Sequence, residues 1–253
     1  MSIALPSSVL QMDKHPSRST KYIHVPTVDV INHFVDQGWE VRKAEQSKCR
    51  TPENVAYTRH WVNLIAPQEK SFGEFTPQIT ITNSHNGTSS FKFIAGLFRF
   101  VCSNGLVVGT ETHSIIARHS QNELGRVING EYEVVMDEVG ELAKTATAWK
   151  GIALTTGQSE KFAYEAALLR HEKAAVDTIH LPSLLSVTRE DDKGAGLWQT
   201  YNRVQEKLIK GGYYYLNGES DHMMRARVVK DGARDHELNR ALFKLAGQYS
   251  EAA

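Results

Sequence analysis

Residues 83–109 read NSHNGTSSFKFIAGLFRFVCSNGLVVG, and this stretch decides how the first half of the chain folds. The Asn86-Gly87 pair suits the tight turn of a β-hairpin, with residues 90–96 as the returning strand. Apolar residues then recur with the i, i+3, i+4, i+7 spacing of a helix, at Ile94, Leu97, Phe98 and Val101. The pattern predicts a helix that ends at Asn104-Gly105, with an uninterrupted strand as the alternative.

The residues before this stretch predict one helix and a set of strands. Residues 27–38, TVDVINHFVDQG, combine Thr27 as an N-cap with an amphipathic apolar stripe, which is typical of a helix. Period-two alternation predicts strands within 39–48 and 55–66. The β-branched segment 79–84, ITITNS, is expected to form the first strand of the hairpin.

The second half of the chain has the period of helices. Four segments carry this period: 125–150, 159–171 with Ser159 as its cap, 197–212 with a Gly-Gly stop, and 236–252. The tyrosine-rich residues 213–232 are predicted to be irregular and mobile.

These elements predict an α+β fold. We expect an N-terminal helix and an antiparallel β-meander with a packed helix, followed by a mainly helical C-terminal half. The expected domains are an α+β core domain over 1–120 and a helical region over 121–253 packed on it, with one continuous domain as the alternative.

Composition indicates a globular protein of the cytoplasm. The sequence starts without a basic segment followed by an apolar run, and no stretch approaches the roughly 20 apolar residues that cross a bilayer. We therefore expect neither export nor a membrane partner. The two cysteines, Cys49 and Cys102, suit a reducing compartment and are expected to be buried as small apolar residues.

Charge is balanced overall but unevenly spread. Residues 121–195 hold eight Lys and Arg against thirteen Asp and Glu, whereas the rest of the chain is net basic. A modest basic face built from the N-terminal region and the C-terminal helices follows from this pattern, and a solvated acidic helix pair is its alternative explanation.

The common catalytic signatures are missing from the sequence. It contains no GxxxxGK[ST], GxGxxG, GxSxG or HExxH motif. The spacings of Cys102, His113 and His119 match no zinc pattern, so we expect no metal and no cofactor. A non-catalytic protein is favoured over an enzyme.

Basic residues with aromatic neighbours recur at four places: RSTKY (18–22), YTRHW (57–61), FKF (91–93) and YNRVQEKLIKGGYYY (201–215). Single-stranded nucleic acids are held by cations along the backbone and by rings that stack on bases. The alternative is ordinary amphipathic covering of strands and helices. The predicted DNA-binding residues are Arg18, Lys21, Tyr22, Arg42, Lys43, Tyr57, Arg59, Trp61, His85, Lys92, Arg99, Arg203, Lys207 and Lys210.

Two of these residues are open to a structural explanation. His85 lies in the predicted turn NSHNG, whose polar residues suit a phosphate or a base edge but are also ordinary turn formers. Arg99 is the one charge in an apolar run, where it must pair, reach solvent or contact a ligand.

Four segments carry a family resemblance: DKHPSRSTKYIHVPT (13–27), residues 83–109, LWQTYNRVQEKLIKGG (197–212) and LNRALFKLA (238–246). Together they resemble the YfjQ/YafZ-like family of prophage and plasmid proteins, domain of unknown function 932. The resemblance implies a mobile-element context but supplies no activity and no catalytic residue. The predicted outline is also similar to phage annealing proteins of the Rad52-like type, which is an analogy of fold alone.

The leading hypothesis is a non-catalytic protein that binds single-stranded DNA and promotes strand annealing or recombination, as a homo-oligomer. The alternative is a counter-defence or regulatory protein that binds a host protein through the acidic residues 131–141, EYEVVMDEVGE. A third hypothesis is a metal enzyme built around His85, His113 and His119.

Overall fold

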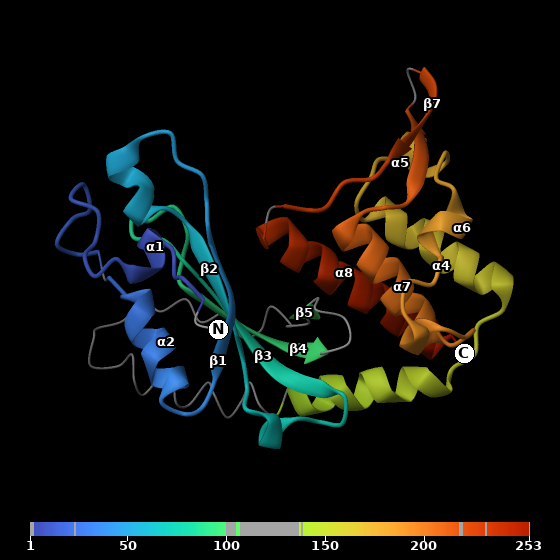
Figure 1. Ribbon diagram of the computed structural model, residues 1–253, viewed down its shortest axis with the longest axis horizontal. Helices are drawn as coiled ribbons and strands as arrows, with labels where there is room; N and C mark the ends of the chain where they lie inside the picture. The colour runs from blue at the N-terminus through green and yellow to red at the C-terminus, as the bar shows by residue number, and fades with distance from the viewer. Residues whose placement is uncertain are drawn as a thin grey trace. The chain divides into compact units, whose positions relative to one another are not determined.

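The computed structural model describes residues 3–22, 24–99, 105–106, 137, 139–217, 220–230 and 232–252. The chain divides into two compact units, Met1–Glu141 and Leu142–Ala253. Antiparallel strands dominate the first unit, and most of the helices lie in the second (Figure 1). The predicted α+β fold with a helical C-terminal half is confirmed. The predicted domain boundary at 120/121 lies outside the described residues.

A five-stranded antiparallel sheet forms the centre of the first unit. Its strands are β1 (Glu40–Gln46), β2 (His60–Ile65), β3 (Phe75–Asn83), β4 (Lys92–Arg99) and β5 (Gly105–Leu106). They follow one another in space as they do in sequence, so the sheet is a meander. All nine residues of β3 are buried, which makes it the middle of this core.

Helix α2 (Thr27–Val35) covers one face of this sheet (Figure 1). Phe34 of α2 packs on Phe93 of β4 with ring centroids 5.3 Å apart. The helix predicted at 27–38 is confirmed, but its predicted cap is wrong. Pro26 is the N-cap, and the Thr27 hydroxyl is buried against His60 instead.

The helix predicted from Ile94 is wrong, because residues 92–99 form strand β4. This strand pairs with β3 in continuous register, from Lys92 opposite Thr82 to Arg99 opposite Phe75. Apolar residues on both faces of a buried strand can imitate a helical stripe over a short run. Backbone pairing with β3 along its whole length favours the strand over the helix at these residues.

The β3–β4 connection is longer than the predicted tight hairpin turn. Residues 84–91 join the two strands, with Gly87 at a φ of +72°. Strand β2 also begins later than predicted, because residues Pro52–Tyr57 form a 3₁₀ helix, η1. The described part of the first unit also contains two short elements, α1 (Ser7–Leu10) and the 3₁₀ helix η2 (Gln68–Lys70).

The second unit is a group of helices with one hairpin. Its elements are η5 (Trp149–Gly151), α4 (Thr156–Leu168), α5 (Lys173–Val176), α6 (Leu181–Leu184), η6 (Glu190–Asp192), α7 (Leu197–Lys210), β6 (Tyr214–Asn217), β7 (Ser220–Arg225) and α8 (Gly232–Glu251). Aromatic rings fill its core: Trp149 lies 4.4 Å from Phe243, and Trp198 stacks on Tyr201 at 5.6 Å between centroids. A helix over 139–148 precedes η5.

Most predictions for the second unit hold, and two need correction. Helix α4 begins before Ser159, because Thr155 forms a capping box with Gln158. Of the segment predicted to be irregular, Tyr214–Asn217 and Ser220–Arg225 pair as the β6–β7 hairpin, with Tyr214 opposite Arg225 and Leu216 opposite Met223. Of the helix predicted within 125–150, residues 125–136 lie outside the described part. No described helix is long and apolar enough to cross a membrane.

Candidate nucleic-acid interface

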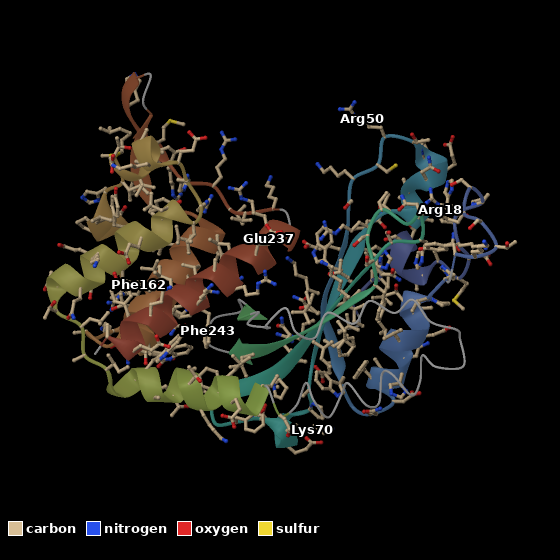
Figure 2. The ribbon with its side chains drawn as sticks, turned by 180° about the vertical axis from the view of Figure 1, so that it is seen from behind. Arg18, Arg50, Lys70, Phe162, Glu237 and Phe243 are labelled. Carbon is tan, nitrogen blue, oxygen red and sulfur yellow. The ribbon has the colours of Figure 1, made fainter. Side chains whose placement is uncertain are left out.

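Residues 13–22 form a strap that crosses the β3–β4 connection. The amide of His15 donates to the carbonyl of His85 at 2.9 Å, and the Tyr22 hydroxyl donates to the carbonyl of Ser84 at 3.0 Å. Figure 2 shows Arg18 and Arg50 at this end of the sheet and Lys70 at the opposite end. The strap and the connection are therefore one surface, named here the turn surface.

Arg18, Tyr22 and Gly87 meet on the turn surface. A Cβ atom placed on Gly87 would lie 3.0 Å from Nη1 of Arg18 and 3.5 Å from Cε2 of Tyr22. Arg18 is exposed and forms no ion pair within the described residues. Burial raises the pKa of Tyr22, against the opposing effect of the Arg18 charge, so the phenol stays neutral. An exposed cation and an aromatic ring thus flank a position without a side chain.

A buried hydrogen-bond chain supports this surface from below. Asn83 donates to Oγ1 of Thr27 at 3.0 Å and to the carbonyl of Val25 at 2.9 Å. The Thr27 hydroxyl donates in turn to Nε2 of His60 at 2.8 Å, because Nδ1 of His60 donates to the carbonyl of Thr58. These bonds fix α2 and the start of β2 to the end of β3.

Three histidine rings pack together beside this chain of bonds. The centroid of His85 lies 4.6 Å from that of His24 and 5.0 Å from that of His60. Nε2 of His85 donates to the carbonyl of Ser8 at 2.8 Å, whereas its buried Nδ1 has no partner among the described residues. Burial lowers the pKa of His85 to about 3 and that of His60 to about 4. All three rings are neutral at pH 7, so they pack as core residues.

Several predicted DNA-binding residues lie on the surface. The exposed ones are Arg18, Lys21, Arg42, Lys43, Lys92 and Lys210, and the partly exposed ones are Tyr22, Tyr57, Arg59 and Lys207. Arg18, Lys21 and Tyr22 lie together on the strap, and Lys92 begins β4 at the same end of the sheet. Lys43 is held by Glu45 at 3.0 Å in the middle of β1.

Three predicted residues are buried and serve the core. Trp61 is only 9% exposed, and its indole N–H donates to Oε2 of Glu45 at 2.8 Å. His85 belongs to the histidine cluster, and Arg203 is only 8% exposed. Their positions leave them out of any surface that a nucleic acid could reach. The side chain of Arg99 lies outside what the structure describes.

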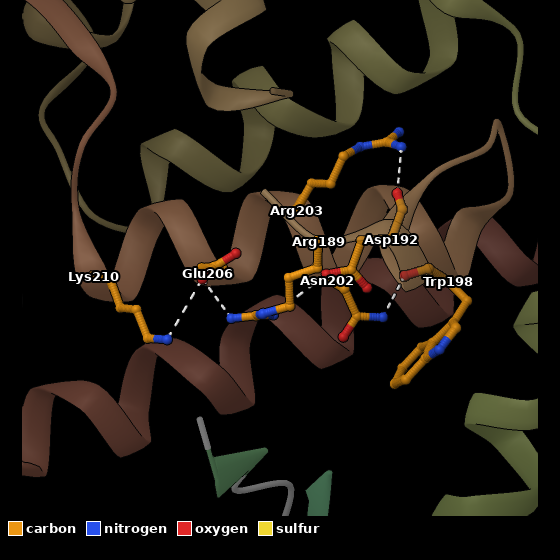
Figure 3. A network of polar contacts seen from close by, with 7 residues as sticks. All are labelled: Arg189, Asp192, Trp198, Asn202, Arg203, Glu206 and Lys210. Carbon is orange, nitrogen blue, oxygen red and sulfur yellow. Dashed lines mark hydrogen bonds and ion pairs between the residues drawn. The ribbon is translucent and has the colours of Figure 1, made fainter. Parts of the chain in front are cut away.

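Arg203 and its neighbours on α7 form a structural network (Figure 3). The Arg203 guanidinium donates to the carbonyls of Asp192 at 2.8 Å and Gly194 at 2.7 Å. Arg189 pairs with the buried carboxylate of Glu206, which Lys210 also approaches at 3.5 Å. This network fixes the polar residues 190–196 to α7, because it satisfies their carbonyls and balances the buried charges.

The prediction from sequence missed the exposed residues of the β6–β7 hairpin. Tyr214 is 41% exposed and lies directly opposite the exposed Arg225. The signal was available, because Asn-Gly, present here as Asn217-Gly218, is a common turn pair of β-hairpins.

No group of three or more His, Cys, Asp or Glu among the described residues is arranged to hold a metal ion. His113, His119 and Cys102 lie outside the described residues, as does most of the acidic segment 131–141. Cys49 is partly exposed and free, so the expectation that it is buried is wrong.

Comparison with known proteins identifies relatives along nearly the whole chain. The family model described as Domain of unknown function (DUF932) matches residues 14–243. The UPF0380 protein YafZ of Escherichia coli (strain K12) is 34% identical over 241 residues, which cover 94% of this chain and 86% of that protein. The UPF0380 protein YfjQ of the same organism is 33% identical over equal shares. No solved structure matches the chain, so the Rad52-like outline stays a prediction.

Proposed function

The chain belongs to the DUF932 family, and we propose that it binds single-stranded DNA as a non-catalytic protein of a mobile element. The observation that carries this proposal is the meeting of Arg18 and Tyr22 beside Gly87 on the turn surface. The comparisons supply the family but no activity, so the proposal rests on the chemistry of this surface.

Each of the three residues has a defined part in binding. The Arg18 guanidinium contacts a phosphate, because it is exposed and free of a carboxylate within the described residues. The Tyr22 ring offers a stacking surface for a base, since its hydroxyl is already anchored on Ser84. Gly87 lets both side chains lie close against the turn, since a Cβ atom there would approach Nη1 of Arg18 to 3.0 Å. The hydrogen bonds of the strap hold this arrangement before the ligand arrives.

Further cations extend the surface along a strand of nucleotides. Lys21 follows on the strap, Arg50 lies at the same end of the sheet, and Lys92 opens β4 there. Single-stranded DNA is the favoured ligand because its bases are free to stack on Tyr22, whereas those of a duplex are not.

Fluorescence anisotropy with a labelled oligonucleotide tests the proposal. We expect binding at about 50 mM salt that weakens strongly by about 200 mM, since each phosphate contact contributes roughly −0.7 to the slope of log K against log salt. Absence of binding at the lower salt, or binding without salt dependence, would overturn it.

A matched pair of charge variants assigns the binding to the turn surface. Arg18→Gln is expected to lower the salt slope by about 0.7, the share of one contact. Lys70→Gln removes one charge at the opposite end of the sheet and should leave binding unchanged (Figure 2). An equal loss in both variants would show a diffuse charge effect and would contradict the assignment.

Strand annealing is the finer part of the proposed function. It is tested by mixing complementary oligonucleotides, one of them quenched, with and without the protein. We expect faster pairing and a DNA-dependent increase in the size of the protein, consistent with a homo-oligomer. A protein that stays monomeric and leaves the pairing rate unchanged would restrict the function to binding.

A further inference from the structure

The β6–β7 hairpin presents an exposed apolar and basic face in the second unit. Because paired residues of antiparallel strands point to the same side, Tyr214, Leu216, Met223 and Arg225 share one face. Tyr214 is 41% exposed and Met223 is 58% exposed, and Arg225 is also exposed. We call these four residues the hairpin face.

The base of the hairpin is firmly attached to the helices of its own unit. The amide of Gly212 donates to the carbonyl of Ala226 at 2.9 Å, and that of Ala226 donates to Tyr213 at 2.8 Å. The Arg170 guanidinium lies over the Tyr213 ring and donates to the carbonyls of Leu208 and Arg227. These bonds leave little freedom at the base of the hairpin, so the backbone that carries Tyr214 is held in place before any ligand binds.

The outer edge of β6 is occupied as well. The amide of His180 donates to the carbonyl of Tyr214 at 2.9 Å, and the Tyr214 amide donates to the hydroxyl of Ser183 at 3.0 Å. Thr178 donates to the carbonyl of Leu216. These three backbone groups of β6 are therefore already bonded, so the hairpin offers a partner mainly its side chains.

Positive charge accompanies the apolar side chains of the hairpin. Arg225, Arg227 and Lys230 follow one another on the exposed chain that leaves β7. Tyr214 lies directly opposite Arg225, so an aromatic ring and a guanidinium are neighbours in the second unit. Tyr22 and Arg18 form the same kind of pair in the first unit. An apolar surface flanked by cations is complementary to bases joined by phosphates.

We propose that the hairpin face is a second contact site for single-stranded nucleic acid, with a base stacked on Tyr214 and a phosphate bound by Arg225. This inference rests on the proposed function, because the ligand is the same. Met223 widens the stacking surface, and Arg227 and Lys230 follow the backbone of the strand. A strand that engages both units gains affinity from linking the two sites.

The affinity of oligonucleotides of two lengths tests this second site. The wild-type protein is compared with Tyr214→Ala, Tyr214→Phe and Arg225→Gln, using single strands of about 10 and about 40 nucleotides. We expect Tyr214→Ala to bind the longer strand about tenfold more weakly, the usual scale for one stacked base. Tyr214→Phe keeps the ring and should bind as the wild type does. Arg225→Gln should lower the salt slope by about 0.7.

Lys244→Gln is the matched charge control. Lys244 is exposed in the second half of α8, whereas the hairpin precedes the N-terminus of this helix. Thermal unfolding of every variant confirms that the fold is kept. Photo-crosslinking to a strand containing 5-bromodeoxyuridine, followed by peptide mapping, should place a crosslink within 213–217.

The possible outcomes separate this inference from the proposed function. If the wild-type protein binds no single strand of either length, the proposed function fails and this site fails with it. If the wild type binds and the Tyr214 and Arg225 variants match it at both lengths, the hairpin site alone is overturned. Loss of self-association or of binding to a protein, with unchanged DNA binding, would also overturn it.

Discussion

The imidazole centroids of His60 and His85 lie 5.0 Å apart. Both side chains are fully buried at the end of the sheet where β3 ends and the connection to β4 begins. Burial is the main reason why both pKa values are low, and for His85 the neighbouring His60 and His24 add to it. Neither folded ring can take up a proton at mildly acidic pH, whereas the unfolded chain can.

This difference predicts that acid destabilises the protein. The folded pKa values of about 4 and about 3 lie below the usual 6.5, so the stabilisation is complete above pH 6.5 and is lost as the pH falls through the range down to 4 and 3. Each histidine should lower the free energy of unfolding by about 2 kcal/mol between pH 6.5 and pH 5. Urea denaturation across this range measures the loss.

Two histidine variants check which rings are responsible. His85→Gln keeps a donor for the carbonyl of Ser8 without an ionisable ring, and should flatten the pH dependence. His180→Gln changes an exposed histidine of the second unit and should leave it as in the wild type. An unaltered profile in His85→Gln would mean that His60 or other groups cause the acid sensitivity.

Arg203 is predicted to stabilise the fold without taking part in DNA binding. Its guanidinium bridges the carbonyls of Asp192 and Gly194 and donates to the Thr200 hydroxyl at 3.0 Å. Arg203→Met leaves these buried acceptors without a donor, and should lower the free energy of unfolding by about 3 kcal/mol. The folded fraction should bind DNA like the wild type. A stable variant with weak DNA binding would reverse this assignment.

Part of the first unit could be predicted from sequence, where the local signal agrees with what the fold buries. The apolar stripe of residues 27–38 matches the face of α2 that the structure buries, at Val30, Ile31 and Phe34. Strand β2 is buried on both faces, so its burial does not follow the predicted alternation. The failure at β4 has a physical cause. Ile94 and Leu97 fit a helix as well as a strand, and only pairing with the neighbouring strands β3 and β5 distinguishes the two.

The sequence could not show which side chains of the candidate site are exposed to solvent. Arg18 and Trp61 both belong to basic and aromatic runs, yet one is exposed and the other donates to Glu45 from the edge of the core. Tyr214 is not among the predicted DNA-binding residues, because the sequence predicts an irregular segment over residues 213–232. The positive φ angles of Gly211 and Gly212 in fact turn the chain directly into a hairpin.

Gly211 and Gly212 predict a contrast between two neighbouring alanine substitutions. A Cβ atom on Gly211, at a φ of +79°, would lie 2.3 Å from the carbonyl oxygen of Ala226, whereas one on Gly212 would meet nothing closer than 3.5 Å. Gly211→Ala should cost about 3 kcal/mol or more, and Gly212→Ala about 1 kcal/mol from its backbone conformation alone. Chemical denaturation measures both. Equal losses would show that the hairpin base can shift away from the added methyl group.

Gly87 allows the charge of the turn surface to be changed at a single position. Its φ of +72° is one that Asn and Asp tolerate better than other residues, so Gly87→Asp and Gly87→Asn form a matched pair of nearly equal shape. The aspartate would place a carboxylate beside Nη1 of Arg18 and oppose a bound phosphate. We expect DNA binding about tenfold weaker for Gly87→Asp, with a salt slope smaller by about 0.7, and nearly unchanged for Gly87→Asn. Anisotropy titrations at two salt concentrations distinguish the cases. An equal loss in both variants would assign the effect to the shape of the turn, and wild-type affinity in both would remove Arg18 and its neighbours from the interface.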